Sequence, residues 1–413
     1  MSRRVVITGI GYGLPGLMSI GDAAWRSLVA GESQVHPYGL PDDEPFDPPD
    51  GRPEYRDDAD LRDRWPGPWQ VAGPGSPFLR VNCGAEQLAH LAGQAAMRQA
   101  GLGGLFRPAV GDPNRFGLSV GGSKGFVGYG FGGPLDAWDD RVATGLQPSQ
   151  LVDSIGRLVP HGRRSCPVAA CATGLVSAIQ ATQWIRWGET DTVLAGSADC
   201  AAVPLVMASY RRLGVLCPSR PRPFDRDRDG FVIGEGVGML VLDDERAAAA
   251  RGTEPLAVIA GEDMRSDAAG LVAADPSGEA VAVCVGNAIE SAALDPSDID
   301  AICLHGTGTR QNDLAEGRGL RRVFRSGLDD IPAVSVKGAW GHTLGASGAL
   351  ETAVAVEMLR RQVVPPHVGL RQIDPACEVA NLTTEAREHP IRHVLKLSLG
   401  FGGHLAAAVL SRA

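Results

Sequence analysis

Lysine is nearly absent from this 413-residue sequence. Lys124, Lys337 and Lys396 are the only three, so arginine supplies 36 of the 39 basic residues, a bias typical of a GC-rich genome. Positive charge is not in excess either, because 48 acidic residues give a formal net charge of −9. A protein that binds nucleic acid normally presents a basic face to the phosphates, so this balance argues against that function.

Long apolar runs and paired cysteines are also missing. No stretch reaches the roughly 18 uninterrupted apolar residues that a membrane span needs. Two N-terminal arginines before an apolar run imitate an export signal, but glycines and Pro15 interrupt that run, which favours a first buried strand, VVITG, from Val5. The eight cysteines show no CxxC spacing, which favours free thiols in a reducing cytoplasm and predicts no metal site.

The composition is that of a globular protein, with 44% hydrophobic and 21% charged residues. Apolar, β-branched runs recur beside glycine, and we predict them as buried strands. They lie at 5–9, 116–122, 192–199, 238–244, 256–261, 301–306, 333–338 and 405–411. Alanine-rich segments between them, notably 174–187 and 345–361, predict helices. Such alternation indicates an α/β fold whose helices cover the faces of a sheet.

Two stretches resemble each other closely enough to indicate an internal duplication. CATGLVSAIQATQWI starts at Cys171 and GASGALETAVAVEML starts at Gly345, and both place a turn of small residues before an alanine-rich helix. A glycine-rich strand entry follows each one, at Gly234 and Gly400, after about sixty and about fifty-five residues. This spacing is typical of a repeated unit.

The duplication predicts a first half at residues 1–245, which carries Cys171, and a second half at 246–413. The first half has about eighty additional residues between its first strand and its helix. Part of this excess, residues 42–68, is dense in Pro, Asp and Arg and has little periodicity. We therefore predict a long surface excursion there.

Cys171 is the candidate nucleophile. Small residues precede it in AACATG and a helix pattern follows it. Backbone N–H groups and the positive end of the helix dipole stabilise a thiolate in such a position, which predicts a lowered thiol pKa. The alternative, a buried small hydrophobic side chain, suits most of the other seven cysteines.

Two histidines and a lysine form the second candidate group. His305 begins HGTGT directly after the apolar run AICL, and His342 lies in KGAWGHTLGASG, which begins at Lys337. Side chains at the ends of strands project into the crevice where α/β proteins bind ligands. A single histidine is usually structural, but this combination opposite a poised cysteine predicts a shared functional site.

Three other glycine-containing motifs are weaker. GIGYG at Gly9 lacks the GxGxxG spacing of a dinucleotide turn and the acidic residue that should follow. Ser123 stands in a GxSxG frame like that of a hydrolase, but the next segment is too rich in glycine for the supporting helix. DRDRDG at Asp225 begins like a calcium loop but has Gly236 in place of the final Glu, so we predict a solvated, salt-bridged turn.

Five motifs in order resemble those of the β-ketoacyl-ACP synthases, together with VVITGIG at the start. They are ACATG around Cys171, PFDRDRDGFVIGEGVGMLVL at Pro223, HGTGT at His305, KGAWGHTLGASG at Lys337 and GFGGH at Gly400. Each is weak alone, but their order and spacing agree across nearly the whole chain. The resemblance implies the thiolase fold, in which two similar βαβαβαββ halves form a five-layered αβαβα sandwich that is normally dimeric.

The resemblance also implies the chemistry, a decarboxylative Claisen condensation with malonyl-ACP. Cys171 would hold the acyl chain as a thioester. His305 and His342 would promote loss of carbon dioxide and stabilise the resulting enolate with hydrogen bonds, without a metal. The backbone N–H groups of Cys171 and Phe401 would form the oxyanion hole, and Phe401 would also gate access.

Further residues take supporting roles by the same resemblance. Lys337 would orient the site and tune its charge, paired with Glu316. Thr307 and Thr309 would hydrogen-bond the phosphopantetheine arm of the carrier. Gly402 and Glu316 are grouped with them as substrate-binding residues. No cofactor is implied other than the phosphopantetheine that the carrier brings.

The implied partners are an acyl carrier protein and a second subunit, either identical or a ketosynthase-like chain-length factor. A carrier protein is acidic, so a net-negative enzyme should receive it on a local basic rim. Arg211 and Arg212, just after PLVMASY, are the candidates for this docking. The alternative is that they are ordinary solvated arginines of a helix.

Departures from the family pattern bear on the specific role. Residues 397–399 are Leu-Ser-Leu where Asn-Ser-Phe is common, Gly338 replaces the usual Ser, and the segment before Cys171 is shorter by roughly ten residues. These changes favour a dedicated polyketide-pathway enzyme over primary fatty-acid elongation. Two alternatives remain: an acyltransferase that acts without decarboxylation, and a chain-length-factor-like binding subunit, which usually lacks the cysteine.

Overall fold

The computed structural model describes residues 3–14, 22–35, 84–124, 147–202, 204–218, 220–272, 274–379 and 381–413. The surface excursion predicted at 42–68 lies outside the described residues and stays a prediction. Among the helices of these described ranges, none is long and apolar enough to cross a membrane.

Ten strands pair in the order β3-β2-β4-β5-β1-β6-β12-β11-β7-β8. The first five are β1 (Val5–Gly13), β2 (Phe116–Gly121), β3 (Arg163–Ser165), β4 (Thr192–Asp199) and β5 (Gly236–Asp244). The other five are β6 (Ala257–Ser266), β7 (Ala301–Cys303), β8 (Ala333–Val334), β11 (His393–Gly400) and β12 (His404–Ser411). A separate pair joins β9 (Val363–Val364) to β10 (Arg387–Glu388).

The strand order repeats, as the duplicated sequence motifs predict. Each strand can be numbered by its order along the chain within its group of five. Read from the outer edge of the sheet toward the junction of β1 and β6, both groups then have the order third, second, fourth, fifth, first. Both also pair the fifth strand antiparallel with the first and fourth, and the second parallel with the third and fourth. The groups join where β1 meets β6, through only two residue pairs, Val6 with Val258 and Ile7 with Ala257.

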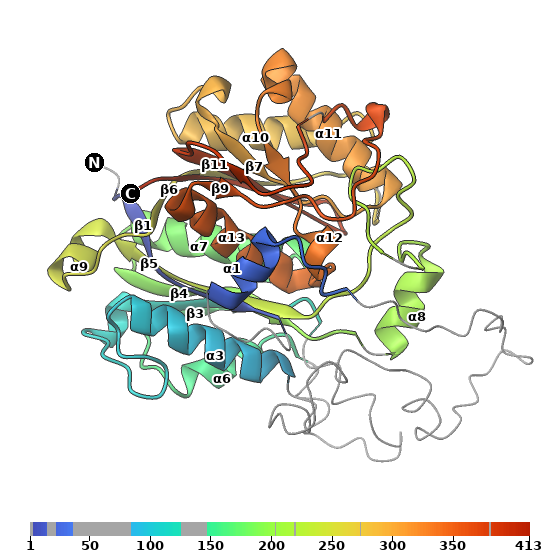
Figure 1. The fold of residues 1–413 in the computed structure, drawn as a ribbon. Helices are drawn as coiled ribbons and strands as arrows, with labels where there is room; N and C mark the ends of the chain where they lie inside the picture. The colour runs from blue at the N-terminus through green and yellow to red at the C-terminus, as the bar shows by residue number, and fades with distance from the viewer. Residues whose placement is uncertain are drawn as a thin grey trace, which may run out of the picture.

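Figure 1 shows five layers. Helices α7 (Thr173–Arg186) and α13 (Ser347–Arg361) lie between the two groups of strands. Helices α3 (Gly84–Gln99) and α6 (Gln150–Gly156) cover the outer face of the first group, and α10 (Glu279–Ser291) and α11 (Arg310–Phe324) cover that of the second. This arrangement confirms the predicted αβαβα sandwich.

The remaining helices of the described ranges are short. They are α1 (Asp22–Val29), α8 (Pro204–Arg212), α9 (Glu245–Ala250) and α12 (Lys337–Trp340). Single 3-10 turns are η2 (Pro113–Arg115), η4 (Ala170–Ala172), η5 (Pro296–Asp298), η6 (Arg325–Asp329), η7 (Leu344–Ala346) and η8 (Pro375–Cys377). Two of these turns, η4 and η7, lead directly into the central helices α7 and α13.

The small residues at the start of α7 and α13 let the two central helices approach closely. A Cβ atom at Gly174 would lie 2.3 Å from the backbone nitrogen of Ala349, and one at Gly348 would lie 2.3 Å from that of Leu175. Both contacts are shorter than any side chain tolerates, so only glycine fits. Close packing here brings the helix starts of the two halves, and therefore Cys171 and His342, to one place.

Candidate active site

Cys171 lies in the turn η4 at the start of α7 and is 4% exposed. The residue before it, Ala170, has φ +48°, a left-handed conformation that is costly for a residue with a Cβ atom. Leu344 has the same φ in η7, at the start of α13, so the turn belongs to the duplicated unit. Gly400 packs against this turn, since a Cβ atom there would lie 2.6 Å from the carbonyl oxygen of Ala169.

His305 and His342 come from the second half and face each other. His305 follows β7 and His342 follows α12, and their ring centroids are 5.4 Å apart at an interplanar angle of 82°. Both rings are buried. Together with Cys171 they line one cavity of about 400 Å³. The structure thus brings the three predicted residues together from the two halves of the chain.

Four more residues singled out from the sequence line the same cavity: Thr307, Thr309, Phe401 and Gly402. The two threonine hydroxyls are 2.9 Å apart. Lys337 and Glu316 are not among the lining residues, because both are fully buried behind the histidine turn. The residues that line the cavity can therefore touch a substrate, whereas Lys337 and Glu316 can act on it only through other residues.

Both histidines are neutral. Burial lowers the pKa of His305 and of His342 well below the ordinary value, and the charge of Lys337 lowers both further. Lys337 Nζ lies 3.3 Å from His305 Nδ1, and an ammonium can only donate. His305 therefore accepts at Nδ1 and carries its proton on Nε2, so it keeps one N–H to donate.

Lys337 belongs to a buried charge cluster that the sequence analysis assigned incorrectly. We predicted a pair with Glu316, but Lys337 Nζ bonds to Glu351 Oε1 on α13 and donates to the carbonyl oxygen of His305 at 2.6 Å. The other oxygen of Glu351 lies 2.7 Å from Lys396 Nζ on β11. One carboxylate thus stands between two fully buried ammonium groups, and this cluster fixes Lys337 beneath His305.

Glu316 has a different role from the predicted one. Its two oxygens accept the backbone N–H groups of His305 at 2.6 Å and Gly306 at 2.7 Å. Asp313, one turn earlier on α11, accepts that of Thr307 at 3.0 Å. The substrate-binding assignment for Glu316 is therefore wrong: this residue and Asp313 hold the HGTGT turn in shape from behind.

The pKa of the Cys171 thiol also differs from the one that the sequence predicts. Burial raises its pKa to about 11, although the charges of Lys124 and Lys337 and a hydrogen bond from the backbone N–H of Phe401 oppose this. The predicted lowering of the pKa is wrong, because desolvation of the anion outweighs the groups that stabilise it. At neutral pH the resting site holds a thiol.

Four residues near the cysteine and the histidines were missed from the sequence: Glu351 and Lys396 in the buried charge cluster, and Tyr210 and Lys124 in contact with each other beside the cluster of Cys171. Glu351 and Lys396 are charged residues inside apolar elements, and this contrast was the available signal. Lys124 lies in the GGSKG motif that we considered only as a hydrolase frame. The rarity of lysine would have singled it out.

The DRDRDG turn is braced by ion pairs, and three of its residues are exposed: Arg226, Asp227 and Asp229. Asp225 is fully buried and accepts the backbone N–H groups of Arg371 at 2.6 Å and Gln372 at 2.9 Å. Arg228 is 3% exposed and pairs with Asp374 at 2.6 Å. The predicted salt bridge is confirmed, and the predicted solvation holds for the three exposed residues but not for Asp225 and Arg228. In the described ranges, no group of His, Cys, Asp and Glu side chains is arranged to hold a metal ion.

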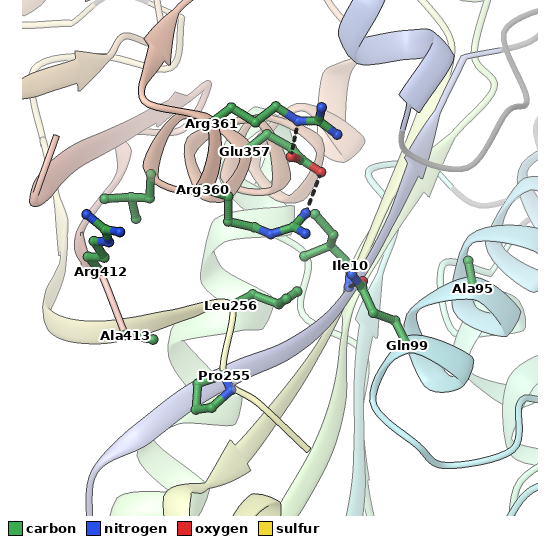
Figure 2. Close-up of a pocket in the computed structure, with 11 residues that line it drawn as sticks. Ile10, Ala95, Gln99, Pro255, Leu256, Glu357, Arg360, Arg361, Arg412 and Ala413 are labelled. Carbon is green, nitrogen blue, oxygen red and sulfur yellow. Dashed lines mark hydrogen bonds and ion pairs between the residues drawn. The ribbon is translucent and has the colours of Figure 1, made fainter. Parts of the chain in front are cut away.

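A larger cavity, of about 800 Å³, lies where α13 ends near the C-terminal strand (Figure 2). Its charged lining is mostly arginine, and Glu357 already pairs with Arg360 at 3.1 Å and with Arg361 at 2.6 Å. Neither cysteine nor histidine lines it. The chemistry-bearing residues thus concentrate in the smaller cavity.

Comparisons with known proteins agree with this arrangement. Residues 2–248 match the family model described as the beta-ketoacyl synthase N-terminal domain, and residues 256–371 match that of the C-terminal domain. The chain is 34% identical to the tetracenomycin polyketide synthase ketoacyl synthase alpha subunit of Streptomyces glaucescens, covering 99% of this chain and 97% of that protein. It is also 34% identical to 3-oxoacyl-[acyl-carrier-protein] synthase 2 of Mycobacterium tuberculosis, over 73% of this chain and 75% of that protein.

Solved structures are similar over the full length. A type II polyketide synthase acyl-carrier protein in complex with its ketosynthase bound to the hexaketide matches with a TM-score of 0.84, 27% identity and complete coverage of both chains. The ishigamide ketosynthase/chain length factor matches with a TM-score of 0.79 and 27% identity, again with complete coverage.

Proposed function

Because this chain belongs to the β-ketoacyl synthase family, a family of acyltransferases that form carbon–carbon bonds, we propose that Cys171, His305 and His342 carry out the condensation. The substrates are an acyl chain held on Cys171 and a malonyl group on an acyl carrier protein. The observation that carries this proposal is the single cavity in which one half supplies a cysteine and the other half supplies two neutral histidines.

The first step loads the enzyme. Cys171 Sγ attacks the carbonyl carbon of the carrier-bound thioester, the bond from that carbon to the phosphopantetheine sulfur breaks, and the thiol proton goes to the leaving sulfur. The backbone N–H of Phe401, which bonds to Cys171, and that of Cys171 donate to the oxygen that becomes negative. Since the resting thiol is protonated, its proton leaves in step with the attack.

The second step forms the new bond. The malonyl carboxylate leaves as carbon dioxide, and the electron pair of the broken carbon–carbon bond becomes an enolate. The N–H groups of His305 and His342 donate to the enolate oxygen, which neutral rings do without losing a proton. The enolate carbon then attacks the acyl carbonyl on Cys171, whose sulfur departs and takes up a proton. The product is a β-ketoacyl chain longer by two carbons.

A polyketide pathway is the setting that the comparisons favour. The similarity to a polyketide ketoacyl synthase alpha subunit spans both proteins almost completely, whereas the similarity to the fatty-acid-type enzyme covers about three quarters of each. We propose that the partners are an acyl carrier protein and a second ketosynthase-like subunit, as in the two similar structures. We also propose that Thr307 and Thr309, which line the cavity, hydrogen-bond the carrier's phosphopantetheine arm.

A direct assay tests the function. The protein is incubated with acyl-ACP and malonyl-ACP, and carbon dioxide and the mass of the carrier-bound product are measured. We expect carbon dioxide release matched by a product two carbons longer. Acyl transfer without decarboxylation would add no carbons, and a binding subunit would release no carbon dioxide. Either of those results overturns the proposal.

The carrier docks, we propose, beside the exposed end of α8. Arg211 and Arg212 are exposed there, and the next residue, Leu213, lines the cavity and is 48% exposed. We expect Arg211→Glu with Arg212→Glu to raise the Michaelis constant for acyl-ACP about tenfold, because like charges then face the acidic carrier, and to change kcat for a small acyl thioester little.

The matched control for docking is Arg246→Glu, an exposed arginine of α9. Figure 1 shows α9 and α8 at opposite sides of the molecule. Arg246→Glu changes the net charge in the same direction without altering the surface beside the cavity. Equal Michaelis constants in the double variant and the wild type would remove the docking assignment.

A further inference from the structure

All three lysines of the chain stand around the active site, although arginine occupies the other 36 basic positions. Lys337 and Lys396 are fully buried on either side of Glu351. Lys124 is the third, and it comes from the first half, just beyond the end of β2. An ammonium is a compact point charge, and a planar guanidinium does not replace it in a confined site. This distribution sets Lys124 apart from the surface cations.

The contacts of Lys124 lead to the nucleophile. Its Nζ lies 5.1 Å from the centroid of the Tyr210 ring, a cation–π distance, and donates to Ser123 Oγ at 3.1 Å. Tyr210 belongs to the same buried cluster of packed side chains as Cys171. The Tyr210 ring also stacks on Phe401, with centroids 6.1 Å apart. Lys124 is thus held against Tyr210, whose cluster of packed side chains also contains the thiol.

The charge of Lys124 is not neutralised by direct contact. Among the described residues no ion pair joins its Nζ to a carboxylate, because Ser123 Oγ stands between Lys124 and Asp199, donating to Asp199 Oδ2 at 2.5 Å. Asp199 is further occupied by the backbone N–H of Gly345 at 2.8 Å. Burial disfavours the ammonium, but Tyr210 and Asp199 hold its pKa above the ordinary value. The cation is therefore present at neutral pH.

The surroundings of Cys171 show what this cation adds. The titratable groups that face the thiol are Lys124, Asp199 and Tyr210 from the first half and His305, His342 and Lys337 from the second. The histidines are neutral and Asp199 opposes an anion, so only the two lysines favour one. Lys337 is bound to Glu351 and to the backbone of His305, whereas Lys124 has no such carboxylate partner.

We infer that Lys124 is a positioning residue of the reaction, whose ammonium, anchored by Ser123 and the Tyr210 ring, stabilises the anionic sulfur of Cys171 during acyl transfer. Lys337 serves His305 and the enolate, and Lys124 serves the nucleophile. The inference rests on the proposed role of Cys171. It predicts that loss of Lys124 slows every reaction of the thiol and leaves the decarboxylation of malonyl-ACP, which depends on the histidines, unchanged within about twofold.

The test is the pH–rate profile of Cys171 alkylation by iodoacetamide, followed by mass spectrometry of the Cys171 peptide. For Lys124→Met we expect alkylation at pH 8 to be about tenfold slower and the profile to move to higher pH, since loss of a nearby cation raises the thiol pKa. Lys124→Arg should stay within about threefold of the wild type. Arg98→Met, an exposed cation on α3, should show no change.

A second variant guards against misfolding. In Lys124→Ala, added ethylammonium should restore alkylation, which a purely structural role of the side chain would not allow. An unshifted profile in Lys124→Met, or a shift of the same size in Arg98→Met, overturns the inference. Because alkylation reports on the thiol alone, the shift is observable even if the protein fails to condense its substrates. The two proposals therefore fail separately.

Discussion

Cys171→Ala is expected to reduce condensation by roughly 10³-fold or more, because Cys171 is the one thiol among the described residues that line the cavity. The measurement is the rate of formation of the extended product from acyl-ACP and malonyl-ACP. Carbon dioxide release from malonyl-ACP alone should persist, since His305 and His342 remain in place. This pattern would separate the acyl acceptor from the decarboxylation machinery.

Cys166→Ala is the matched control for this experiment. Cys166 lies five residues earlier in the same segment, is half-buried and does not line the cavity. We expect it to keep the wild-type rate within about twofold. If Cys171→Ala condenses as fast as Cys166→Ala, the mechanism is wrong.

The second large effect concerns stability. We expect Glu351→Gln to lower the free energy of unfolding by about 3–5 kcal/mol at pH 7, because it leaves the buried ammonium groups of Lys337 and Lys396 without their carboxylate. Urea denaturation measures this loss directly.

The loss of stability in Glu351→Gln should depend on pH in a defined direction. Although burial disfavours the charge of Lys396, Glu351 holds its pKa above the ordinary value in the native protein. Without Glu351 the unfolded chain binds that proton more tightly than the folded one. Stability of the variant relative to the wild type should therefore recover as pH rises from 7 to 10.

Glu357→Gln is the control, two turns further along α13. Glu357 is as buried as Glu351, but its partners Arg360 and Arg361 reach solvent, with side-chain exposures of 37% and 35%. Its removal should cost about 1 kcal/mol or less, since exposed arginines recover their hydration. Equal losses in the two variants would contradict the account of the buried cluster.

Several elements could be predicted from local pattern alone. The runs at 5–9, 192–199 and 405–411 lie within or coincide with strands β1, β4 and β12, because unbroken apolar runs bury on both faces of a central sheet. The strand β11 was missed, since Lys396 interrupts its apolar run. The run at 333–338 gives a strand of only two residues, because Lys337 already begins a short helix.

Spacing along the chain was enough to indicate the duplication, the α/β class and the cysteine–histidine set, since these follow from periodicity and from motifs confined to a few residues. Packing alone settled which carboxylate meets Lys337, how strongly burial opposes the charge of Cys171, and that Lys124 comes close to it. Ion pairs between β11, α12 and α13, and the removal of water from a thiol, arise only once distant segments are pressed together, so no pattern within one segment carries them.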